Sequence, residues 1–273
     1  MGDFNPMAHW PVDPIRAAIA PGRPGFSVEV VAEIDSTNSE LMRRARAGQC
    51  APTLLVAETQ SAGRGRVARA WQSQAGRSLT FSIGITLAPR DWSGLSLAVG
   101  VALADALDPD RERGIALKWP NDLWWQERKL AGILVETVTV PGADAGRRHA
   151  VIGIGINIGK PPPGALSTPP AWLREIEPGI DAAQILGRIA APLLAALDTF
   201  ETIGFAPFHA RFDARDALRG RPVTAAGGND EPLVGTALGV AENGALLVHS
   251  AAGMQALSGS EVSVRPAHVE TGS

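Results

Sequence analysis

Three arginines and two glycines lie within AGRGRVARAW, residues 62–71, a segment that contains no acidic residue. From Thr59 to Arg90 the chain has five arginines and neither Asp nor Glu, although its net charge is −3. A guanidinium group can bind a carboxylate or a phosphate through two hydrogen bonds, and glycine lets the backbone approach a ligand closely. The segment is therefore either a loop that binds a small anion or an ordinary solvated basic loop.

A second group of polar residues lies in KWPNDLWWQERK, residues 118–129. Lys118 and Lys129 flank a Pro-Asn-Asp turn, and an apolar segment follows them. A lysine can stabilise a developing oxyanion, and Asp122 could either hold a magnesium-bound phosphate or position a lysine. These are residues that phosphate chemistry needs, but an ordinary turn with solvated charges contains them as well.

Hydroxyl and amide side chains form a third group at DSTN, residues 35–38. They could hydrogen-bond a polar ligand, and Gln60, next to the arginine segment, could join them. Helix capping is the simpler explanation, because Thr37 and Glu40 have the spacing of a capping box. None of the three groups identifies a reaction by itself.

Two other motif matches fail on their surroundings. The pattern Gly63-x-Gly65-x-x-Ala68 resembles a dinucleotide fingerprint, but neither a crossover helix nor an acid about 20 residues later follows it. GIGINIGK, residues 153–160, resembles a P-loop, but its glycine spacing is too short and Pro161 stands where Ser or Thr should be. The five histidines show no metal-ligand spacing.

The composition is that of an ordinary globular protein. Of the 273 residues, 45% are hydrophobic and 19% are charged. A pI near 6.0 argues against a general nucleic-acid binder, and the lone Cys50 indicates a reducing compartment. The N-terminal residues lack the apolar core of a signal peptide, and no apolar run approaches the roughly 18 residues of a membrane span. We therefore expect a cytoplasmic protein that does not enter the membrane.

Strands and helices must position these groups. Short apolar and β-branched runs predict strands, and longer apolar or amphipathic runs predict helices. The predicted strands are 28–34, 53–58, 78–87, 115–119, 130–140 and 149–158. The predicted helices are 36–47, 94–107, 181–201 with a kink at Pro192, and 205–218. Proline content predicts a surface loop at 161–170. The pattern indicates an α+β domain with a mixed β-sheet and helices, and not a doubly wound sheet.

The chain is expected to divide near residue 219. Residues 1–26 contain five prolines and form an N-terminal extension with at most one short helix. Residues 27–219 form the main domain. Over residues 220–273, short β-segments alternate with GGND, ENG and AAG turns, which is typical of a small all-β domain.

Taken together and in this order, the motifs closely resemble those of biotin protein ligases. They are DSTN at 35–38, ETQSAGRGR at 58–66, Trp71, KWPNDL at 118–123, KLAGILVE at 129–136 and GIGIN at 153–157. The resemblance covers roughly residues 27–265 and implies a class II synthetase-like catalytic fold with a small SH3-like β-barrel at the C-terminus. This chain departs from the family at Ala68, where glycine is common, and at Phe81, where Tyr is frequent. About 26 residues precede the first predicted strand, too few for the DNA-binding domain of some relatives, so no DNA partner is expected.

The resemblance implies a two-step reaction. The carboxylate of biotin attacks the α-phosphate of ATP, which gives biotinyl-5′-adenylate and pyrophosphate, and a lysine of a biotin carboxyl carrier domain then displaces AMP. The implied catalytic residues are Lys129, Arg64, Arg66 and Asp122. Lys129 would bridge the biotin carboxylate and the α-phosphate, and the two arginines would clamp the biotin carbonyl side and the phosphates.

The same resemblance implies two binding sites. The biotin-binding residues would be Ser36, Thr37, Asn38, Gln60, Gly63, Arg64, Gly65, Arg66, Lys129 and Gly132. The ATP-binding residues would be Arg66, Arg69, Trp71, Lys118, Asn121, Asp122, Lys129 and Asn157. The polar residues would match the ureido ring of biotin, whereas Trp71 and residues 133–135 would form apolar walls. No side-chain cluster predicts a resident metal, and Mg²⁺ would arrive with ATP, near Asp122.

Two other functions remain open on the sequence. A lipoate ligase shares the related fold, but lipoate has no ureido ring, so the polar cluster at 36–38 favours biotin. An RNA-binding module that uses the Arg/Gly loop and the small β-domain is disfavoured by the pI and by the absence of tyrosine. The expected partner is the biotin carboxyl carrier domain of a biotin-dependent carboxylase, and the expected state is a monomer or a weak homodimer.

Overall fold

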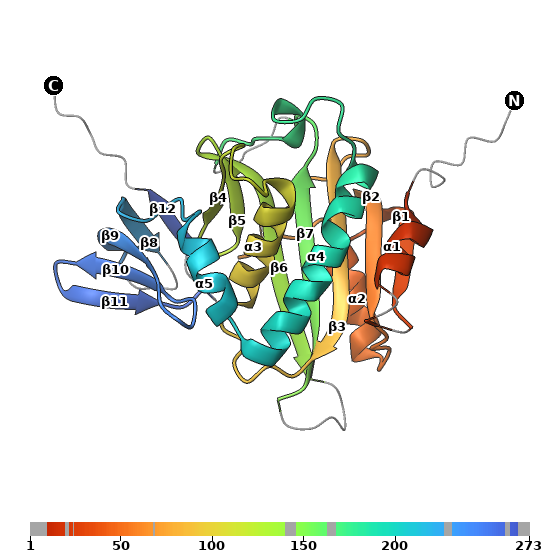
Figure 1. Cartoon of the computed structure of the whole chain (residues 1–273), viewed down its shortest axis with the longest axis horizontal. Coiled ribbons are helices and arrows are strands. Elements are labelled where there is room, and N and C mark those ends of the chain that lie inside the picture. Colours follow the sequence, from red (N-terminus) through yellow and green to blue (C-terminus); the bar gives the residue numbers. More distant parts are fainter. Residues whose placement is uncertain are drawn as a thin grey trace, which may run out of the picture.

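Two β-sheets organise the chain (Figure 1). The larger sheet has seven strands in the order β1-β2-β3-β7-β6-β5-β4, and the smaller has five in the order β11-β10-β9-β8-β12. The computed structural model describes residues 10–19, 22–23, 25–67, 69–139, 146–162, 168–226, 231–259 and 263–266. Within these residues β1 and β2 pair in parallel and the other strand pairs are antiparallel, so the predicted α+β class with a mixed sheet is confirmed.

The strands of the larger sheet lie close to their predicted positions. They are β1 (Ser27–Ile34), β2 (Thr53–Gln60), β3 (Ser78–Leu87), β4 (Ile115–Lys118), β5 (Asp122–Trp125), β6 (Arg128–Thr139) and β7 (Arg148–Asn157). The predicted turn at residues 120–122 joins β4 to β5, and β5 was not anticipated as a strand of its own. It pairs with both β4 and β6, so Lys118 at the end of β4 and Lys129 in β6 lie on the two strands that flank β5.

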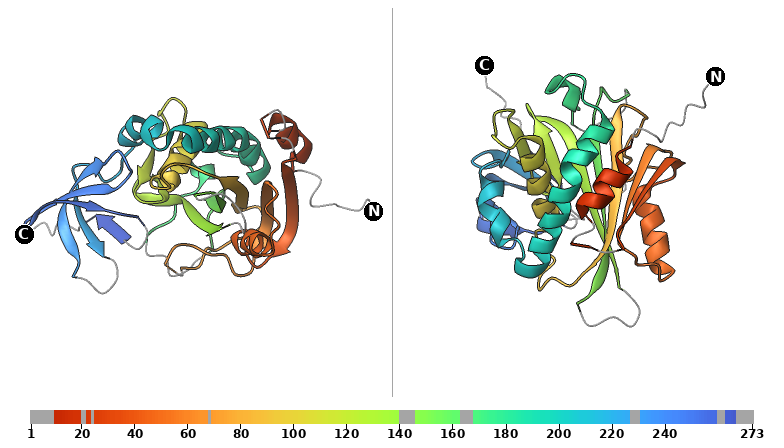
Figure 2. Two further views of the ribbon diagram at one scale, coloured as in Figure 1. Left: turned by 90° about the horizontal axis from the view of Figure 1, so that it is seen from below. Right: turned by 45° about the vertical axis from the view of Figure 1, so that its right-hand side comes forward.

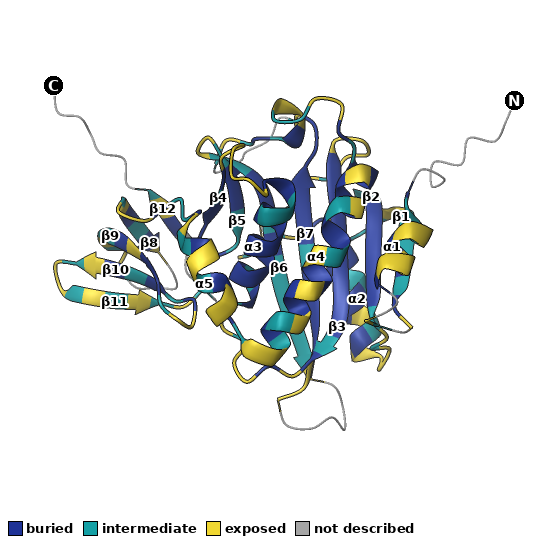
Figure 3. Cartoon of the chain, viewed as in Figure 1, coloured by how far each residue is buried: buried dark blue, intermediate teal, exposed yellow. Residues whose placement is uncertain are grey.

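Helices cover both faces of the larger sheet (Figure 2). They are α1 (Val12–Ile19), α2 (Thr37–Arg46), α3 (Leu95–Leu107), α4 (Ala182–Ile203) and α5 (Ala206–Asp213), with a 3₁₀ turn at Leu173–Glu175. Helices α1, α3 and α4 pack into the main core on one face, whereas α2 places Leu41 and Met42 against Leu55 and Val151 on the other. The central strands are therefore buried on both faces (Figure 3), which explains the nearly continuous burial of β3.

Helix α4 corrects one expectation. By length and composition its 22 residues could cross a membrane, although no such segment was expected from the sequence. Its apolar side chains, among them Ile189, Leu193 and Leu197, belong instead to the main core between the helices and the sheet, where α4 packs beside α3. We therefore describe α4 as a core helix. It continues through Pro192.

Two predicted helix ends were wrong. Helix α2 is capped by Ser36, whose Oγ accepts a hydrogen bond from the Ser39 amide, and not by a Thr37–Glu40 capping box. The helix predicted over 205–218 ends at Asp213 because the chain then runs along the edge of β4. There the Leu117 amide donates to the Arg215 carbonyl at 2.7 Å, and the Arg215 guanidinium is buried against Asp108. A buried guanidinium needs an acceptor for each of its N–H donors. Arg215 reaches its acceptors because the chain leaves the helix after Asp213.

The second sheet forms a small barrel-like unit, as predicted. Its strands are β8 (Pro222–Ala226), β9 (Leu233–Val240), β10 (Leu246–Ser250), β11 (Gly253–Leu257) and β12 (Ser263–Pro266). The predicted GGND turn at 227–230, residues 163–167 of the predicted proline-rich loop, and residues 1–9, 20, 21 and 24 of the N-terminal extension lie outside the described residues. The unit contacts the larger sheet through Trp119, whose Nε1 donates to the Gly244 carbonyl at 3.0 Å.

Candidate active site

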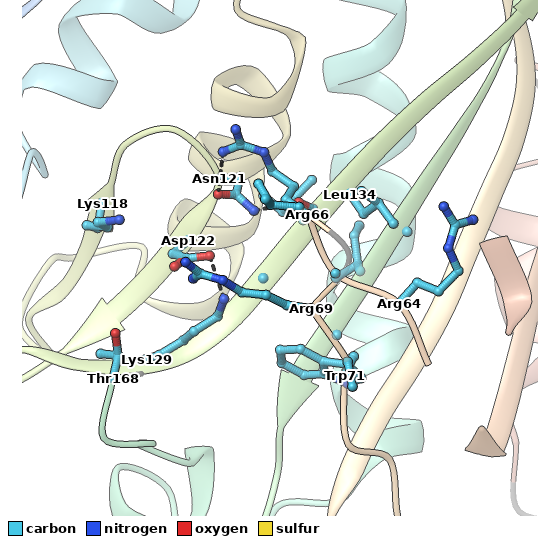
Figure 4. Close-up of a pocket in the computed structure, with 18 of the residues that line it drawn as sticks. Arg64, Arg66, Arg69, Trp71, Lys118, Asn121, Asp122, Lys129, Leu134 and Thr168 are labelled. Carbon is cyan, nitrogen blue, oxygen red and sulfur yellow. Dashed lines mark hydrogen bonds and ion pairs between the residues drawn. The ribbon is translucent and has the colours of Figure 1, made fainter. Parts of the chain in front are cut away.

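A cavity of about 1020 Å³ opens on the face of the larger sheet that carries α2 (Figure 4). Its walls come from the start of α2, the end of β2, the loop after it, the β4–β5 turn, β6 and β7. Residues 264–266 of the small sheet complete the wall. The volume is at the upper end of the range typical of small-molecule sites, so the cavity can hold more than one substrate.

A chain of hydrogen bonds forms the polar end of the cavity. The Thr37 hydroxyl lies 2.7 Å from the Ser82 hydroxyl, which donates to Asn38 Oδ1 at 2.8 Å. The side-chain carbonyl of Gln60 accepts from the Thr37 amide at 2.7 Å. Thr37, Asn38 and Ser82 are all buried, so these polar groups are ordered before any ligand contributes a hydrogen bond.

Glycines in β6 and β7 make room for two side chains that lie directly on the face of the sheet. A Cβ atom at Gly153 would lie 2.3 Å from Asn38 Oδ1, and one at Gly155 would lie 2.3 Å from the Trp71 ring. Gly132, the strand partner of Gly155, has the Lys129 ammonium and Trp71 close above it. The GIGIN motif is thus a flat floor for Asn38 and Trp71, which accounts for its glycines without any phosphate loop.

Lys129 and Asp122 form an ion pair inside the cavity. The Lys129 Nζ lies 2.7 Å from Asp122 Oδ1, and the ammonium also lies 5.8 Å from the centre of the Trp71 ring. Both side chains project from neighbouring strands, β5 and β6, toward the same space (Figure 4). The carboxylate therefore holds the ammonium in place and partly neutralises it.

The backbone of Lys129 is held from outside the sheet. Its amide donates to the Pro169 carbonyl at 2.8 Å, and its carbonyl accepts from the Ala171 amide at 2.8 Å. The side-chain amide of Asn157 donates to the carbonyls of Lys129 at 3.2 Å and Ala171 at 2.9 Å. Asn157 does not line the cavity, so its side chain acts on the position of Lys129 instead of facing a ligand.

Lys118 and Asn121 occupy the cationic end. Burial lowers the pKa of Lys118 to about 8, and the nearby Asp122 carboxylate opposes that shift. Asn121 donates from Nδ2 to the Ile133 carbonyl at 2.8 Å and accepts from Arg66 at 3.1 Å. Burial also lowers the pKa of Arg66. Cations with little solvent around them interact strongly with an anion that enters the cavity.

The arginine loop folds over the cavity as a short hairpin. The Gly65 amide donates to the Arg69 carbonyl at 2.7 Å, and the Trp71 amide donates to the Gly63 carbonyl at 2.9 Å. Arg66 also donates to the Gly259 carbonyl of the C-terminal unit. Ala68, one of the two departures from the family, lies outside the described residues, whereas Phe81 lies in β3 and lines the cavity.

The Arg64 guanidinium points away from the Lys118 end of the cavity (Figure 4). It makes two hydrogen bonds to Glu136, at 3.0 and 3.1 Å, in a partly exposed ion pair. The Arg64 side chain is thus tied to β6, and this ion pair fixes only the start of the arginine loop.

The structure brings most of the predicted site residues together. Those that line the cavity are Ser36, Thr37, Asn38, Gln60, Arg64, Gly65, Arg66, Arg69, Trp71, Lys118, Asn121, Asp122, Lys129 and Gly132. Gly63 and Asn157 do not line it. Sequence reasoning missed Thr80, Ser82, Glu136 and the C-terminal residues Arg221, Val264, Arg265 and Pro266. The alternation Ser78, Thr80, Ser82 in an otherwise apolar strand was the available signal for the first two.

Among the described residues no group of three or more His, Cys, Asp or Glu side chains could hold a metal ion. The carboxylates that line the cavity are Asp122 and Glu127, and Glu127 pairs with Arg221 at 2.9 Å. Asp122 is paired with Lys129, and its charge also acts on Lys118.

Comparisons with known proteins decide between the open alternatives. The family model "Biotin/lipoate A/B protein ligase family" matches residues 30–157, and "Biotin protein ligase C terminal domain" matches residues 219–265. The bifunctional ligase/repressor BirA of Escherichia coli (strain K12) is 36% identical over 250 residues, which cover 89% of this chain and 75% of that protein. The chain belongs to the biotin protein ligase family.

Other members of the biotin protein ligase family extend the match. The biotin--[acetyl-CoA-carboxylase] ligase of Paracoccus denitrificans is 33% identical over 244 residues, which cover 85% of this chain and 98% of that protein. A structure of the biotin protein ligase from Aquifex aeolicus in complex with biotin and ATP superimposes with a TM-score of 0.73 at 27% identity. It covers 88% of this chain and 99% of that one. The resemblance inferred from the motifs and the expected fold are thereby confirmed, and an RNA-binding module is disfavoured.

Proposed function

We propose that this enzyme is an ATP-dependent biotin protein ligase that forms biotinyl-5′-adenylate and transfers biotin to a lysine of a carrier domain. One observation carries the proposal: a single cavity joins a polar end at Thr37 and Gln60 to a cationic end at Lys118, with Lys129 between them. The first end suits a ureido ring and the second suits a phosphate chain. A carboxylate placed between them meets the α-phosphate beside Lys129.

In the first step, a biotin carboxylate oxygen bonds to the α-phosphorus and the bond to the bridging oxygen breaks, so that pyrophosphate leaves. Both reactants are anionic, and Lys129 offsets their repulsion because its ammonium lies between the two ends of the cavity. Asp122, at 2.7 Å, holds that ammonium in position. Lys118 and Arg66 stabilise the charge of the departing pyrophosphate. ATP enters with its Mg²⁺ as the substrate, and Asp122 is the nearest carboxylate that could contact that ion.

In the second step, the amine of the acceptor lysine attacks the carbonyl carbon of the mixed anhydride, AMP leaves and the amine loses its proton. Trp71, Ile133 and Leu134 form the apolar wall that keeps water from the anhydride. We assign the rim of the cavity, with Arg221 and residues 264–266, to the approach of the acceptor, because these residues belong to or adjoin the small sheet.

Biotin suits the polar end better than lipoate does. The buried Thr37, Asn38 and Ser82 are already hydrogen-bonded to one another, and Gln60 lies beside them. A site built around polar groups rejects a ligand that leaves them unpaired by about 10⁴-fold or more. A dithiolane ring provides no hydrogen-bond partner for Thr37 or Gln60.

We also propose an acceptor, a compartment and an oligomeric state for this enzyme. The acceptor is the biotin carboxyl carrier domain of a biotin-dependent carboxylase, and the reaction takes place in the cytoplasm, where the lone Cys50 stays reduced. Residues 27–219 act as the catalytic unit and 220–273 as a unit that closes the site or docks the acceptor. The protein works as a monomer or a weak homodimer.

The decisive test is ATP–pyrophosphate exchange with biotin and with lipoate, measured side by side on the same preparation. We expect biotin to support exchange and lipoate to give only background. Exchange with lipoate at a comparable rate would make the enzyme a lipoate ligase, and no exchange with either acid would overturn the proposal. Transfer is then followed by adding a carrier domain and detecting its mass increase.

A further inference from the structure

Glu136 lies at the far end of the hydrogen-bond chain that lines the polar end of the cavity. Its Oε2 accepts from Asn38 Nδ2 at 2.9 Å, and both of its oxygens accept from Arg64. The chain thus runs from Thr37 through Ser82 and Asn38 to this carboxylate. Glu136 itself is not part of the cavity wall, and neither the motifs nor the proposed mechanism gives it a role.

A carboxylate at this position fixes the direction of every hydrogen bond in the chain. A carboxylate can only accept, so the Asn38 NH₂ group must face Glu136 and the Asn38 carbonyl must face Ser82. Ser82 then gives its one proton to Asn38 and must accept from Thr37. The Thr37 hydroxyl proton is used for Ser82, its nearer partner at 2.7 Å, while Gln60 lies at 3.1 Å.

We propose that Glu136 is a positioning residue that makes Thr37 a hydrogen-bond acceptor toward the ligand. The inference rests on the proposed function, because it assigns the free lone pairs of Thr37 to an N–H group of the ureido ring. Gly153 permits the arrangement, since a Cβ atom there would lie 2.3 Å from Asn38 Oδ1. Specificity for an N–H at this point is therefore set by a residue that never touches the ligand.

The same carboxylate ties ligand recognition to the arginine loop. Arg64 lies near the start of that loop, and one of its two hydrogen bonds to Glu136 shares the acceptor Oε2 with Asn38. The exposed fractions of the two side chains, 47% for Arg64 and 23% for Glu136, leave the ion pair partly solvated. Its net effect on stability is then small, and the direction of the chain is the larger consequence.

The test compares biotin with two cyclic carbamate analogues, in each of which one ureido N–H is replaced by a ring oxygen. Wild-type enzyme should bind biotin more tightly than the analogue whose oxygen faces Thr37, by about tenfold or more, because two acceptors then face each other. In Glu136→Gln the side-chain amide can donate to Asn38, so the chain can reverse and Thr37 can donate. We expect this variant to lose about tenfold in biotin affinity and most of its discrimination against that analogue.

Three variants separate direction from packing. Glu136→Asp keeps an acceptor-only group and should retain the wild-type ratio of affinities. Arg64→Met removes the ion pair but leaves the carboxylate facing Asn38, and it should retain that ratio even if biotin binds more weakly. Glu177→Gln breaks a comparable pair, with Arg188 and Arg113, that lies outside the cavity wall, and it should change neither affinity.

Two results would overturn the inference: an unchanged ratio in Glu136→Gln, or the same loss in Glu136→Asp as in Glu136→Gln. Thermal unfolding of each variant shows whether it is folded, and a Glu136→Gln protein that does not fold leaves the Glu136→Asp ratio as the deciding measurement. If wild-type enzyme fails to bind biotin at all, the proposed function fails and not merely this part of it.

Discussion

At the scale of single residues, Lys129 should dominate the first step. Lys129→Ala removes the cation that offsets the repulsion between carboxylate and phosphate, so we expect adenylate formation to fall by about 10²-fold or more. Biotin affinity should fall much less, because the polar end of the cavity is untouched. Single-turnover formation of adenylate measures the rate, and calorimetry with biotin alone measures the affinity. A variant within a few-fold of wild type in the rate would contradict the role given to Lys129.

Lys118 should make ATP binding depend on pH. Its pKa is lowered to about 8, so the ammonium that attracts phosphate is fully present below that pH and is lost as the pH rises through it. ATP affinity should therefore fall above pH 8, by at most about tenfold per pH unit. The same burial means that charging Lys118 lowers the free energy of unfolding below pH 8, and this cost disappears between pH 8 and the unfolded pKa near 10.5.

Two variants check the source of this pH dependence. Lys118→Gln should bind ATP weakly at every pH, without a break near pH 8. Lys118→Arg keeps the positive charge, so its ATP affinity should stay constant to higher pH. A break at pH 8 that persists in Lys118→Gln would assign the titration to another group.

At the scale of elements, the glycine floor of β6 and β7 makes room for Trp71, the last residue of the arginine loop. Gly155→Ala places a Cβ atom 2.3 Å from the Trp71 ring, so Trp71 must leave its place. We expect the KM for biotin to rise about tenfold, because the apolar wall is displaced from a site that depends on its geometry. Faster amide exchange across residues 62–71 should accompany the change.

Gly187→Ala in α4 is the matched control for that substitution. Its nearest neighbour is Pro11 Cγ at 3.8 Å, an ordinary van der Waals distance. It should leave the KM unchanged and stabilise the helix slightly. Equal amide exchange of the loop in Gly155→Ala and in wild type would show that Trp71 does not depend on this floor.

The elements also show which parts of the structure the sequence could predict. Local periodicity placed β3 at its observed bounds and found β1, β6 and β7 to within about two residues. It could not place Asn38 over Gly153 or Trp71 over Gly155, because those contacts join segments far apart in the chain. The glycines were read correctly as part of a family motif, but their physical reason is steric and appears only when the strands pair.

Side-chain direction set the other limit of prediction. Arg64 lies in the predicted loop, but its guanidinium is bound to Glu136, which a charge count cannot reveal. The helix predicted over 205–218 ended early because Arg215 is buried at a distant helix end, a contact that overrides the local helical pattern. The types and order of the residues predicted where the site lies. Their hydrogen-bond partners could be identified only from the folded structure.

At the scale of the whole molecule, the small sheet is held close to the cavity by a tight contact of two backbones. A Cβ atom at Gly244 would lie 2.9 Å from Gly94 Cα, next to the bond between Trp119 and the Gly244 carbonyl. Gly244→Ala should therefore shift the small sheet away from the β4–β5 turn. We expect both adenylation and transfer to the carrier domain to slow.

Gly253→Ala is the matched control at this scale. Both glycines have positive φ, +79° for Gly244 and +99° for Gly253, so both substitutions strain the backbone at a cost of roughly 1 kcal/mol. Only Gly253 has open space around its Cβ position. Thermal unfolding should show similar losses for the two variants, and steady-state transfer should slow for Gly244→Ala alone. Full transfer by Gly244→Ala would mean that the small sheet has no part in the reaction.

The floor of β7 has one more consequence, which concerns length. Asn38 rests on Gly153 and Trp71 on Gly155, two residues further along, and Gly132 beside Gly155 carries the Lys129 ammonium. Two residues of a β-strand span about 7 Å, and a backbone held by neighbouring strands cannot stretch. The sheet therefore fixes the distance between the position of the biotin ring and the position of its carboxylate. Biotin homologues shortened or lengthened by one methylene should still bind through the ring, but their carboxylate would miss the attack position by about 1 Å, a displacement that can slow the reaction about 10²-fold. Their kcat for adenylation should fall while their Kd changes little, and equal kcat values across the three chain lengths would show that the enzyme does not measure its substrate.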